Sequence, residues 1–202
     1  MTTFTQLYDL IVDYTKRPEL ITLTKAALKA ATVRAHTSGF FYRDAMSNSQ
    51  SLVLDPSKVW IDIPNVYSLI NNLRAIQCVQ MLQESNDFPL QTLEYVDRQD
   101  IWRPNSNSLK TGVYTLEGST LRLYPNFLTN RIKIEGFVLP VVTEVGFSSW
   151  IANEFAEDLA MWAASIVHAR TGALELARAN LEANVRPFKE MLAETYTVPT
   201  VY

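Results

Sequence analysis

Hydrophobic positions near the start of the chain recur at the spacing of an amphipathic helix. In the segment 4–14 they fall on one helical face, and they are Phe4, Leu7, Tyr8, Ile11 and Tyr14. Pro18 follows, where a first helical turn tolerates proline, and a second helix is predicted up to Gly39 as its C-cap. The apolar face of this helix holds Leu20, Leu23, Ala27, Ala31 and Ala35. The opposite stripe holds Lys25, Lys29 and His36, which we expect to face solvent or an acidic partner.

The pattern changes to alternation in the middle of the chain, which predicts strands. The segments concerned are 58–64, 89–96, 112–125 and 131–142. Gly118 marks the turn of a hairpin, and Gly136 is expected at a bulge. The segment 73–83 fits either a strand or a short helix, and the turn-like residues after it favour a strand pair. The segment 40–57 is expected to begin with aromatic residues and to continue as a polar loop.

Helical spacing returns towards the C-terminus. One helix is predicted from a cap at Ser148 or Ser149 to Gly172, and its buried stripe is Ile151, Phe155, Leu159, Trp162 and Ile166. A further helix follows, and its apolar seam is Leu174, Ala177, Leu181, Val185, Phe188 and Leu192. Pro187 is expected to kink or interrupt this helix.

The order of these elements predicts an α+β protein. We expect a helical bundle of about four helices with an inserted antiparallel β subdomain and an extended C-terminal tail, because amphipathic helices bury one another as a bundle. The predicted parts are the N-terminal helices and loop of the bundle, the β-rich insert, the C-terminal helix pair and the tail, and they span 1–56, 57–145, 146–195 and 196–202.

Composition narrows the class of protein. The chain is 48% hydrophobic and 19% charged, which is typical of a globular protein and not of a disordered one. Its net charge of −3 does not point to nucleic acid. The sequence holds no long apolar run, so we expect neither a signal peptide nor a membrane span. Cys78 is the single cysteine, which excludes an intrachain disulfide and fits a reducing interior.

The sequence contains no recognisable catalytic, metal or cofactor motif. His36 and His168 have no cysteine or second histidine at ligand spacing, and the glycine-rich phosphate motifs and the nucleophile-elbow motif are missing. The carboxylates Glu154, Glu157 and Asp158 lie in the first turns of a predicted helix, where its dipole favours negative charge. We therefore expect a protein that is not an enzyme, with no metal and no cofactor.

Charge is distributed unevenly along the helical segments. The segment 16–43 holds six Lys or Arg residues and one Glu, whereas 144–158 holds four acidic residues and no basic one. The two segments can meet within one bundle or between adjacent copies in a ring. Lys25 and Lys29 can also line a passage for DNA, or simply face solvent. The sequence leaves these alternatives open.

Three stretches carry a resemblance to a known family. They are the helical "AALKAATVRAHTSGFFYRDA", the β stretch "YTLEGSTLRLYPNFLTNRIKIEGFVLPVV" and the helical pair "SWIANEFAEDLAMWAASIVHARTGALELARANLEANVRPFKEML". Their order resembles that of the head-to-tail adaptor proteins of tailed bacteriophages, including the tail tubular protein A group of short-tailed phages. The resemblance implies a structural virion protein, assembled in the host cytoplasm and located at the head–tail junction. It implies a ring of about twelve copies beneath the portal, which extends the channel for double-stranded DNA and binds the next tail or nozzle protein.

The C-terminal residues fit the docking tail that such adaptors carry. The segment 195–202 has no charged side chain. An uncharged tail of this kind suits addition as a strand to a partner, with aromatic anchors in pockets. The expected portal-docking residues are Tyr196, Val198, Pro199, Val201 and Tyr202.

Alternatives to this reading stay open. The tail can instead pack on its own bundle. The other functions that fit are a different neck or tail-completion protein of a virion and a cytoplasmic helical protein that binds a ligand or regulates.

Overall fold

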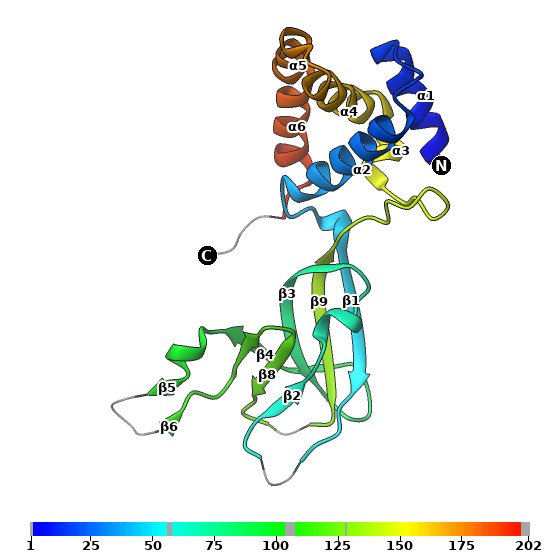
Figure 1. Cartoon of the computed structure of the whole chain (residues 1–202). Coiled ribbons are helices and arrows are strands. Elements are labelled where there is room, and N and C mark those ends of the chain that lie inside the picture. Colours follow the sequence, from blue (N-terminus) through cyan, green and yellow to red (C-terminus); the bar gives the residue numbers. More distant parts are fainter. Residues whose placement is uncertain (1, 56–57, 104–107, 128, 199–202) are drawn as a thin grey trace. The chain divides into compact units, whose positions relative to one another are not determined.

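The computed structural model describes residues 2–55, 58–103, 108–127 and 129–198 (Figure 1). The chain forms two compact units. Unit 1 is helical and combines residues 1–44 with residues 139–202, and unit 2 is the β-rich segment Ala45–Val138. The structure thus divides the chain after Asp44 and after Val138, whereas the sequence placed the ends of the β-rich insert at 57 and 145.

Unit 1 is built from helices contributed by both halves of the chain. The first half supplies α1 (Phe4–Thr15), α2 (Ile21–Thr37) and the 3-10 turn η1 (Tyr42–Asp44). The second half supplies α3 (Trp150–Glu154), α4 (Ala156–Arg170), α5 (Leu174–Asn180), the π-helical segment η4 (Leu181–Val185) and α6 (Arg186–Tyr196). Their inward faces share one apolar core, which includes Leu7, Ile11, Leu28, Ile151, Leu159 and Leu192.

Local capping residues determine where α1 starts and ends. The Thr3 hydroxyl accepts a hydrogen bond from the backbone N–H of Gln6, and the Gln6 side chain accepts one from the Thr3 N–H at 2.9 Å. This reciprocal capping box satisfies two N–H groups that the first helical turn leaves without partners. The helix ends at Thr15, and its C-cap Lys16 has a left-handed φ of 52°.

Small residues bring α2 and α4 together. Ala27, Ala31 and Ala35 are buried on α2, and Ala160 and Ala163 are buried on α4. Side chains this short let two helix backbones approach closely. The predicted apolar face of the second helix is therefore confirmed at its alanines. The helix itself ends at Thr37 with Ser38 as its C-cap, so the prediction of Gly39 as the cap is wrong.

The last helix is interrupted, as Pro187 predicted. The N–H of Arg186 donates to the carbonyl of Leu181, five residues back, and this wider turn forms the π-helical η4 just before Pro187. The predicted seam is only partly buried. Its buried members are Ala177, Val185, Phe188 and Leu192, whereas Leu174 and Leu181 are exposed.

Unit 2 is a curled sheet of seven strands in the order β1-β9-β3-β4-β7-β8-β2, with a separate hairpin formed by β5 and β6 (Figure 1). Neighbouring strands are antiparallel except for β4 and β7, which are parallel. The strands are β1 (Ala45–Ser51), β2 (Ile61–Ile63), β3 (Leu73–Leu82), β4 (Pro89–Tyr95), β5 (Trp102–Arg103), β6 (Ser108–Leu109), β7 (Val113–Glu117), β8 (Thr120–Tyr124) and β9 (Arg131–Val138). The 3-10 turns η2 (Val66–Ser68) and η3 (Arg98–Asp100) lie between them.

Alternating apolar residues form the core of this sheet. Val79, Met81, Leu121, Ile132 and Ile134 are buried and belong to one cluster. The segment 73–83 is a strand, so the strand pair favoured by the sequence is confirmed.

The predicted turn at Gly118 is confirmed, and the bulge expected at Gly136 lies opposite this glycine, in β3. Gly118 turns between β7 and β8 with a φ of 62°. Gly136 pairs with Ile76, where the register of β3 shifts, and a Cβ on Gly136 would lie 2.5 Å from the Ala75 carbonyl oxygen.

The predicted fold class is wrong. We expected about four helices in a bundle with an inserted antiparallel β subdomain, whereas the structure holds a curled sheet of seven strands that forms a compact unit of its own. One cause is β1, which the sequence assigned to a polar loop. Its residues AMSNSQS lack apolar alternation, and the strand forms because it pairs along β9 from Ala45 to Ser51 at the edge of the sheet.

An ion pair in unit 2 links β2 to β8. Asp62 accepts hydrogen bonds from Arg122 Nε at 2.7 Å and from the Trp60 indole at 3.1 Å. Burial acts to raise the pKa of Asp62, but these hydrogen bonds outweigh it, and the pKa lies below the usual carboxyl value. A lowered pKa in the folded state stabilises the protein at neutral pH, and this contribution is lost as the pH falls through the folded-state pKa.

We expect Asp62→Asn to lower the free energy of unfolding by about 1 kcal/mol at pH 7, because it removes a partly buried, charge-assisted hydrogen bond. The difference from the unmodified protein should shrink in acid, as the pH falls through the lowered folded-state pKa of Asp62. Urea unfolding at pH 7 and at the acid end of this range measures the effect. Glu84→Gln, which neutralises an exposed carboxylate in the turn between β3 and β4, is the control. An equal loss at both pH values would contradict the assignment.

Candidate functional site

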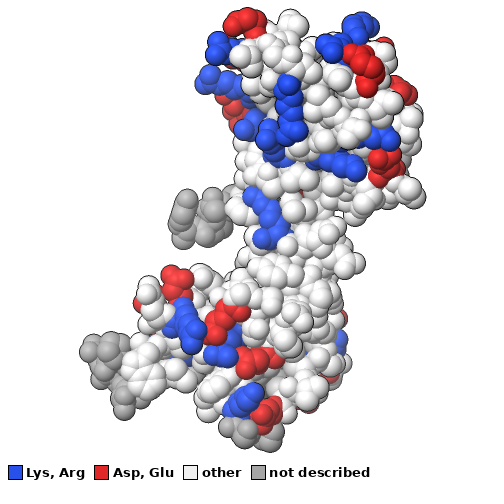
Figure 2. Space-filling model, viewed as in Figure 1, with Lys and Arg blue, Asp and Glu red and all other residues white. Residues whose placement is uncertain are grey.

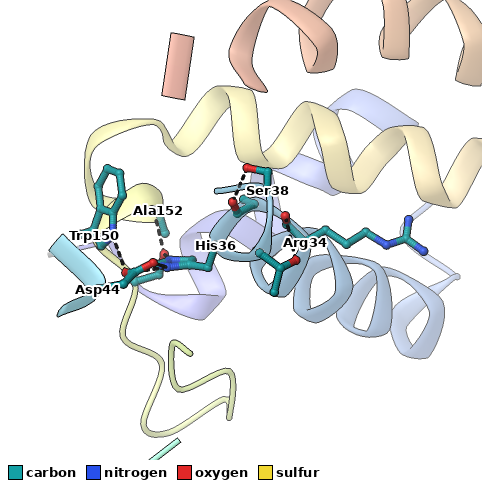
Figure 3. A network of polar contacts seen from close by, with 9 residues as sticks. Arg34, His36, Ser38, Asp44, Trp150 and Ala152 are labelled. Carbon is teal, nitrogen blue, oxygen red and sulfur yellow. Dashed lines mark hydrogen bonds and ion pairs between the residues drawn. The ribbon is translucent and has the colours of Figure 1, made fainter. Parts of the chain in front are cut away.

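A buried polar network joins three elements of unit 1 that are distant in sequence (Figure 3). His36 lies in the last turn of α2, Asp44 ends η1, and Ser149 caps the N-terminus of α3. Their exposed fractions are 2%, 6% and 5%. His36 Nδ1 lies 2.9 Å from both carboxylate oxygens of Asp44, and His36 Nε2 lies 2.9 Å from Ser149 Oγ.

The chemistry of the partners determines the direction of each hydrogen bond. A carboxylate only accepts, so His36 Nδ1 carries the proton that is shared with Asp44. Asp44 also accepts the indole N–H of Trp150 at 2.8 Å. Ser149 Oγ accepts the Ala152 N–H at 3.1 Å, which leaves its own proton to donate to His36 Nε2. Every polar side chain in the network therefore has a partner.

The order Ser149–His36–Asp44 is that of a catalytic triad, but its setting is structural. A nucleophilic serine must reach a substrate, whereas Ser149 is 5% exposed. Its oxygen is also occupied as the N-cap of α3. The network therefore fixes the end of α2, the end of η1 and the start of α3 relative to one another.

Aromatic side chains surround Trp150 and receive the end of α6. The Tyr196 ring lies 4.9 Å from the Trp150 ring and 6.0 Å from the rings of Tyr42 and Phe155. The guanidinium of Arg43 lies 4.7 Å from the Trp150 ring. The tail was predicted to begin at 196, but α6 extends through Tyr196 and this residue packs within unit 1. In the free chain Tyr196 is therefore part of unit 1, and its role in docking to the portal stays a prediction.

The residues after Tyr196 pair with the segment that follows α2. Thr197 forms an isolated antiparallel bridge with Phe41, and the Val198 N–H donates to the Phe40 carbonyl at 2.8 Å. A Cβ on Gly39 would lie 3.1 Å from Thr197 Oγ1, so glycine permits this close approach. Val198 is half-buried here. The other predicted docking residues, Pro199, Val201 and Tyr202, lie outside the described residues.

The predicted basic and acidic residues pair within the chain at two points. Lys25 Nζ lies 2.8 Å from a Glu144 carboxylate oxygen, and Arg43 forms an ion pair with Glu154. The hydrogen bond from Lys25 is the main cause that lowers the pKa of Glu144, and the nearby charge of Lys29 adds to it. The sequence left open whether the basic and acidic segments pair within one bundle or between copies. These two ion pairs form within unit 1 of a single chain.

The remaining predicted charges lie elsewhere on unit 1. Lys29 Nζ lies 5.8 Å from the ring centre of Phe4. Glu157 and Asp158 begin α4, beside Tyr14 of α1. Burial raises the pKa of Asp158, and the charge of Glu157 adds to that shift.

Sequence reasoning missed most of the buried network. It placed His36 on a solvent-facing stripe, which is wrong, because its imidazole is enclosed between Asp44 and Ser149. Asp44, Ser149 and Trp150 were assigned no joint role, since 106 residues separate Asp44 from Trp150 and 113 separate His36 from Ser149. The one signal that the sequence offered for this network was His36, a polar residue in the last turn of an alanine-rich helix.

The described parts of the chain show neither a grouped set of metal ligands nor a helix that could span a membrane. Within them, no three His, Cys, Asp or Glu side chains are grouped as a metal site would require. No described helix has the length and apolar character that a membrane span needs.

Comparison with known proteins identifies no family. The chain matches no protein-family model, and no curated protein matches it.

We expect Asp44→Ala to lower the free energy of unfolding by about 3 kcal/mol or more, because two buried donors, on His36 and Trp150, lose their acceptor. Ser149→Ala should cost about 1–2 kcal/mol through the lost cap and hydrogen bond. Urea denaturation measures both. The matched control is the exposed neighbour Ser148→Ala, expected within about 0.5 kcal/mol of the unmodified protein. Equal costs at Ser148 and Ser149 would contradict the network's structural role.

A fluorophosphonate probe, which modifies activated serine hydroxyls, is expected to leave Ser149 unlabelled, because the residue is buried and its oxygen caps α3. Mass spectrometry of the intact folded protein provides the measurement. Labelling of Ser149 that disappears in His36→Gln would instead identify a working nucleophile.

Proposed function

We propose that this protein is a structural component of a tailed-phage virion, namely a head-to-tail adaptor. In this role, copies assemble as a ring beneath the portal, extend the channel for double-stranded DNA and provide the platform for the next tail or nozzle protein. The proposal includes location at the head–tail junction and no catalytic activity. Its partners are other copies of the chain, the portal protein, the downstream tail protein and passing DNA without base specificity.

The observation that carries the proposal is the way the C-terminal segment leaves unit 1. Tyr196 is held by the aromatic rings around Trp150, and Thr197 and Val198 continue as an extended backbone beside Phe40 and Phe41. The sequence then continues with uncharged residues to its last position. A firmly anchored base followed by an uncharged segment suits strand addition to a partner subunit.

Two further features support the same role. The resemblance rested on the order of the elements, with helices before and after a β-rich segment. The structure has this order, although the sheet is larger than expected. Among the residues that the structure describes, the constellation around Ser149 resembles catalytic machinery, but it is enclosed and Ser149 serves as a cap. A protein whose polar network serves structure fits an assembly component better than a hydrolase.

The anchored position of Tyr196 sharpens the test of docking. Deletion of 199–202 is expected to leave the melting temperature of the free protein nearly unchanged, because the contacts of Tyr196, Thr197 and Val198 remain. The same deletion should abolish attachment to heads that contain the portal but lack this protein. Thermal denaturation and co-sedimentation with heads are the two measurements.

Tyr196→Ala is the matched comparison, since it removes the anchor and keeps the tail. It should lower the melting temperature by about 2–8 °C, because a packed aromatic ring is lost. Normal recruitment of the truncated chain to heads would show that docking uses another surface.

A further inference from the structure

An open groove of about 850 Å³ lies on unit 1 between the end of α2, α4, η4 and α6. Its apolar part is formed by Trp162, Leu181 and Val185. Trp162 and Val185 are buried beneath the surface, whereas Leu181 is 42% exposed. The π-helical η4 spans from the exposed Leu181 to the buried Val185, so one wide turn holds both residues. The groove therefore presents apolar surface that unit 1 does not itself cover.

The rim of the groove is basic. We define the basic rim as Arg34, Arg186 and Lys189, which line the groove together with Glu182 and Glu190. Arg186 is paired with Glu190 at 3.1 Å, and Lys189 Nζ lies 5.6 Å from the Trp162 ring centre. Arg34 is exposed and forms no ion pair with any residue that the structure describes. The rim thus offers positive charge that unit 1 leaves only partly neutralised.

A complementary surface lies on α1 and the start of α4. We define the acidic face as Asp13, Glu157 and Asp158, whose negative charges lie near the aromatic side chain of Tyr14. Tyr14 is 36% exposed, and burial and then the negative charges of Glu157, Asp158 and Asp13 raise its pKa. An exposed aromatic ring near carboxylates has the opposite charge to the basic rim and the shape of an anchor for an apolar groove.

The two surfaces are formed by different elements around α4. Helix α4 contacts α1, which carries Tyr14, and also contacts α5 and η4, which lie at the groove, and Figure 1 shows α1 and α6 flanking it within unit 1. Figure 2 shows Lys and Arg side chains across the middle of the viewed face of this unit. Two different, complementary faces on one subunit are the requirement for head-to-tail association, in which every copy uses both.

We infer that the groove binds the acidic face of a second copy of this chain, with Tyr14 as the aromatic anchor. The ring enters the apolar part of the groove beside Trp162 and Leu181, and the carboxylates around it meet the basic rim. The inference rests on the proposed function, because it names the contact that would join copies in the ring. It differs from the pairing first expected, since Lys25 and Glu154 already have partners within their own chain.

Charge-reversal variants test the contact on the full chain. Variant one is Arg34→Glu with Lys189→Glu, and variant two is Asp13→Lys with Glu157→Lys. All four side chains are exposed, so each variant is expected to fold. Each should weaken self-association about tenfold or more, because like charges then face each other across the contact. Sedimentation velocity over a range of protein concentrations at low salt measures association.

Mixing the variants separates the contact from a general effect of charge. An equimolar mixture of variants one and two should associate again, because the groove of each variant then opposes a complementary face on the other. Association of the unmodified protein and of the mixture should both weaken as salt rises. Lys58→Glu with Arg98→Glu, an equal charge change on exposed residues of unit 2, is the control and should associate as the unmodified protein does.

Three outcomes would overturn the inference. They are an unmodified chain that stays monomeric at every concentration, variants that associate normally, and a mixture that associates no better than its components. None of these decides the proposed function, which depends on recruitment to heads. A chain that binds heads through its tail while variants one and two still associate normally would retain the adaptor role with a different contact between copies.

Discussion

The carboxylate of Asp44 is the constraint on which unit 1 depends. A buried negative charge is unfavourable unless hydrogen bonds replace its lost hydration. Here the imidazole of His36 and the indole of Trp150 supply them, and Ser149 completes the ring of contacts through His36 Nε2. Satisfying this one group brings together the end of α2, the 3-10 turn η1 and the start of α3. The members of the network come from both halves of the chain. The network therefore holds the helices of the two halves in one arrangement within unit 1.

The surface around this network follows from the same arrangement. Trp150 is held by Asp44, so its ring is placed to contact Tyr196 at the end of α6 and Phe41 before η1. These rings determine where the helical part ends and where the extended segment at Thr197 starts. A docking segment gains from such a base, since an anchored start reduces the chain entropy that binding has to overcome.

The π-helical η4 and unit 2 show two other ways in which backbone geometry decides the surface. At the wider turn before Pro187, Leu181 is exposed whereas Val185 and Phe188 are buried, and a groove on unit 1 lies at this turn. In unit 2, the bulge in β3 opposite Gly136 bends the sheet, and a side chain at Gly136 would collide with the Ala75 carbonyl. Both features depend on a single residue that departs from the regular pattern.

The sequence by itself determined the features that depend on neighbouring residues. Helical spacing located α1, α2 and α4, the glycine at 118 located the β7–β8 hairpin, and Pro187 located the break before α6. Only the tertiary structure decided the extent of the sheet, since the polar β1 forms by pairing with a distant strand, and the burial of His36, whose partners lie 8 and 113 residues away. It also decided that Tyr196 belongs to the helical unit and that Lys25 has a partner in Glu144. The physical reason is that periodicity and capping are local properties of the chain, whereas the pairing of a buried charge or an edge strand depends on groups that only folding brings together.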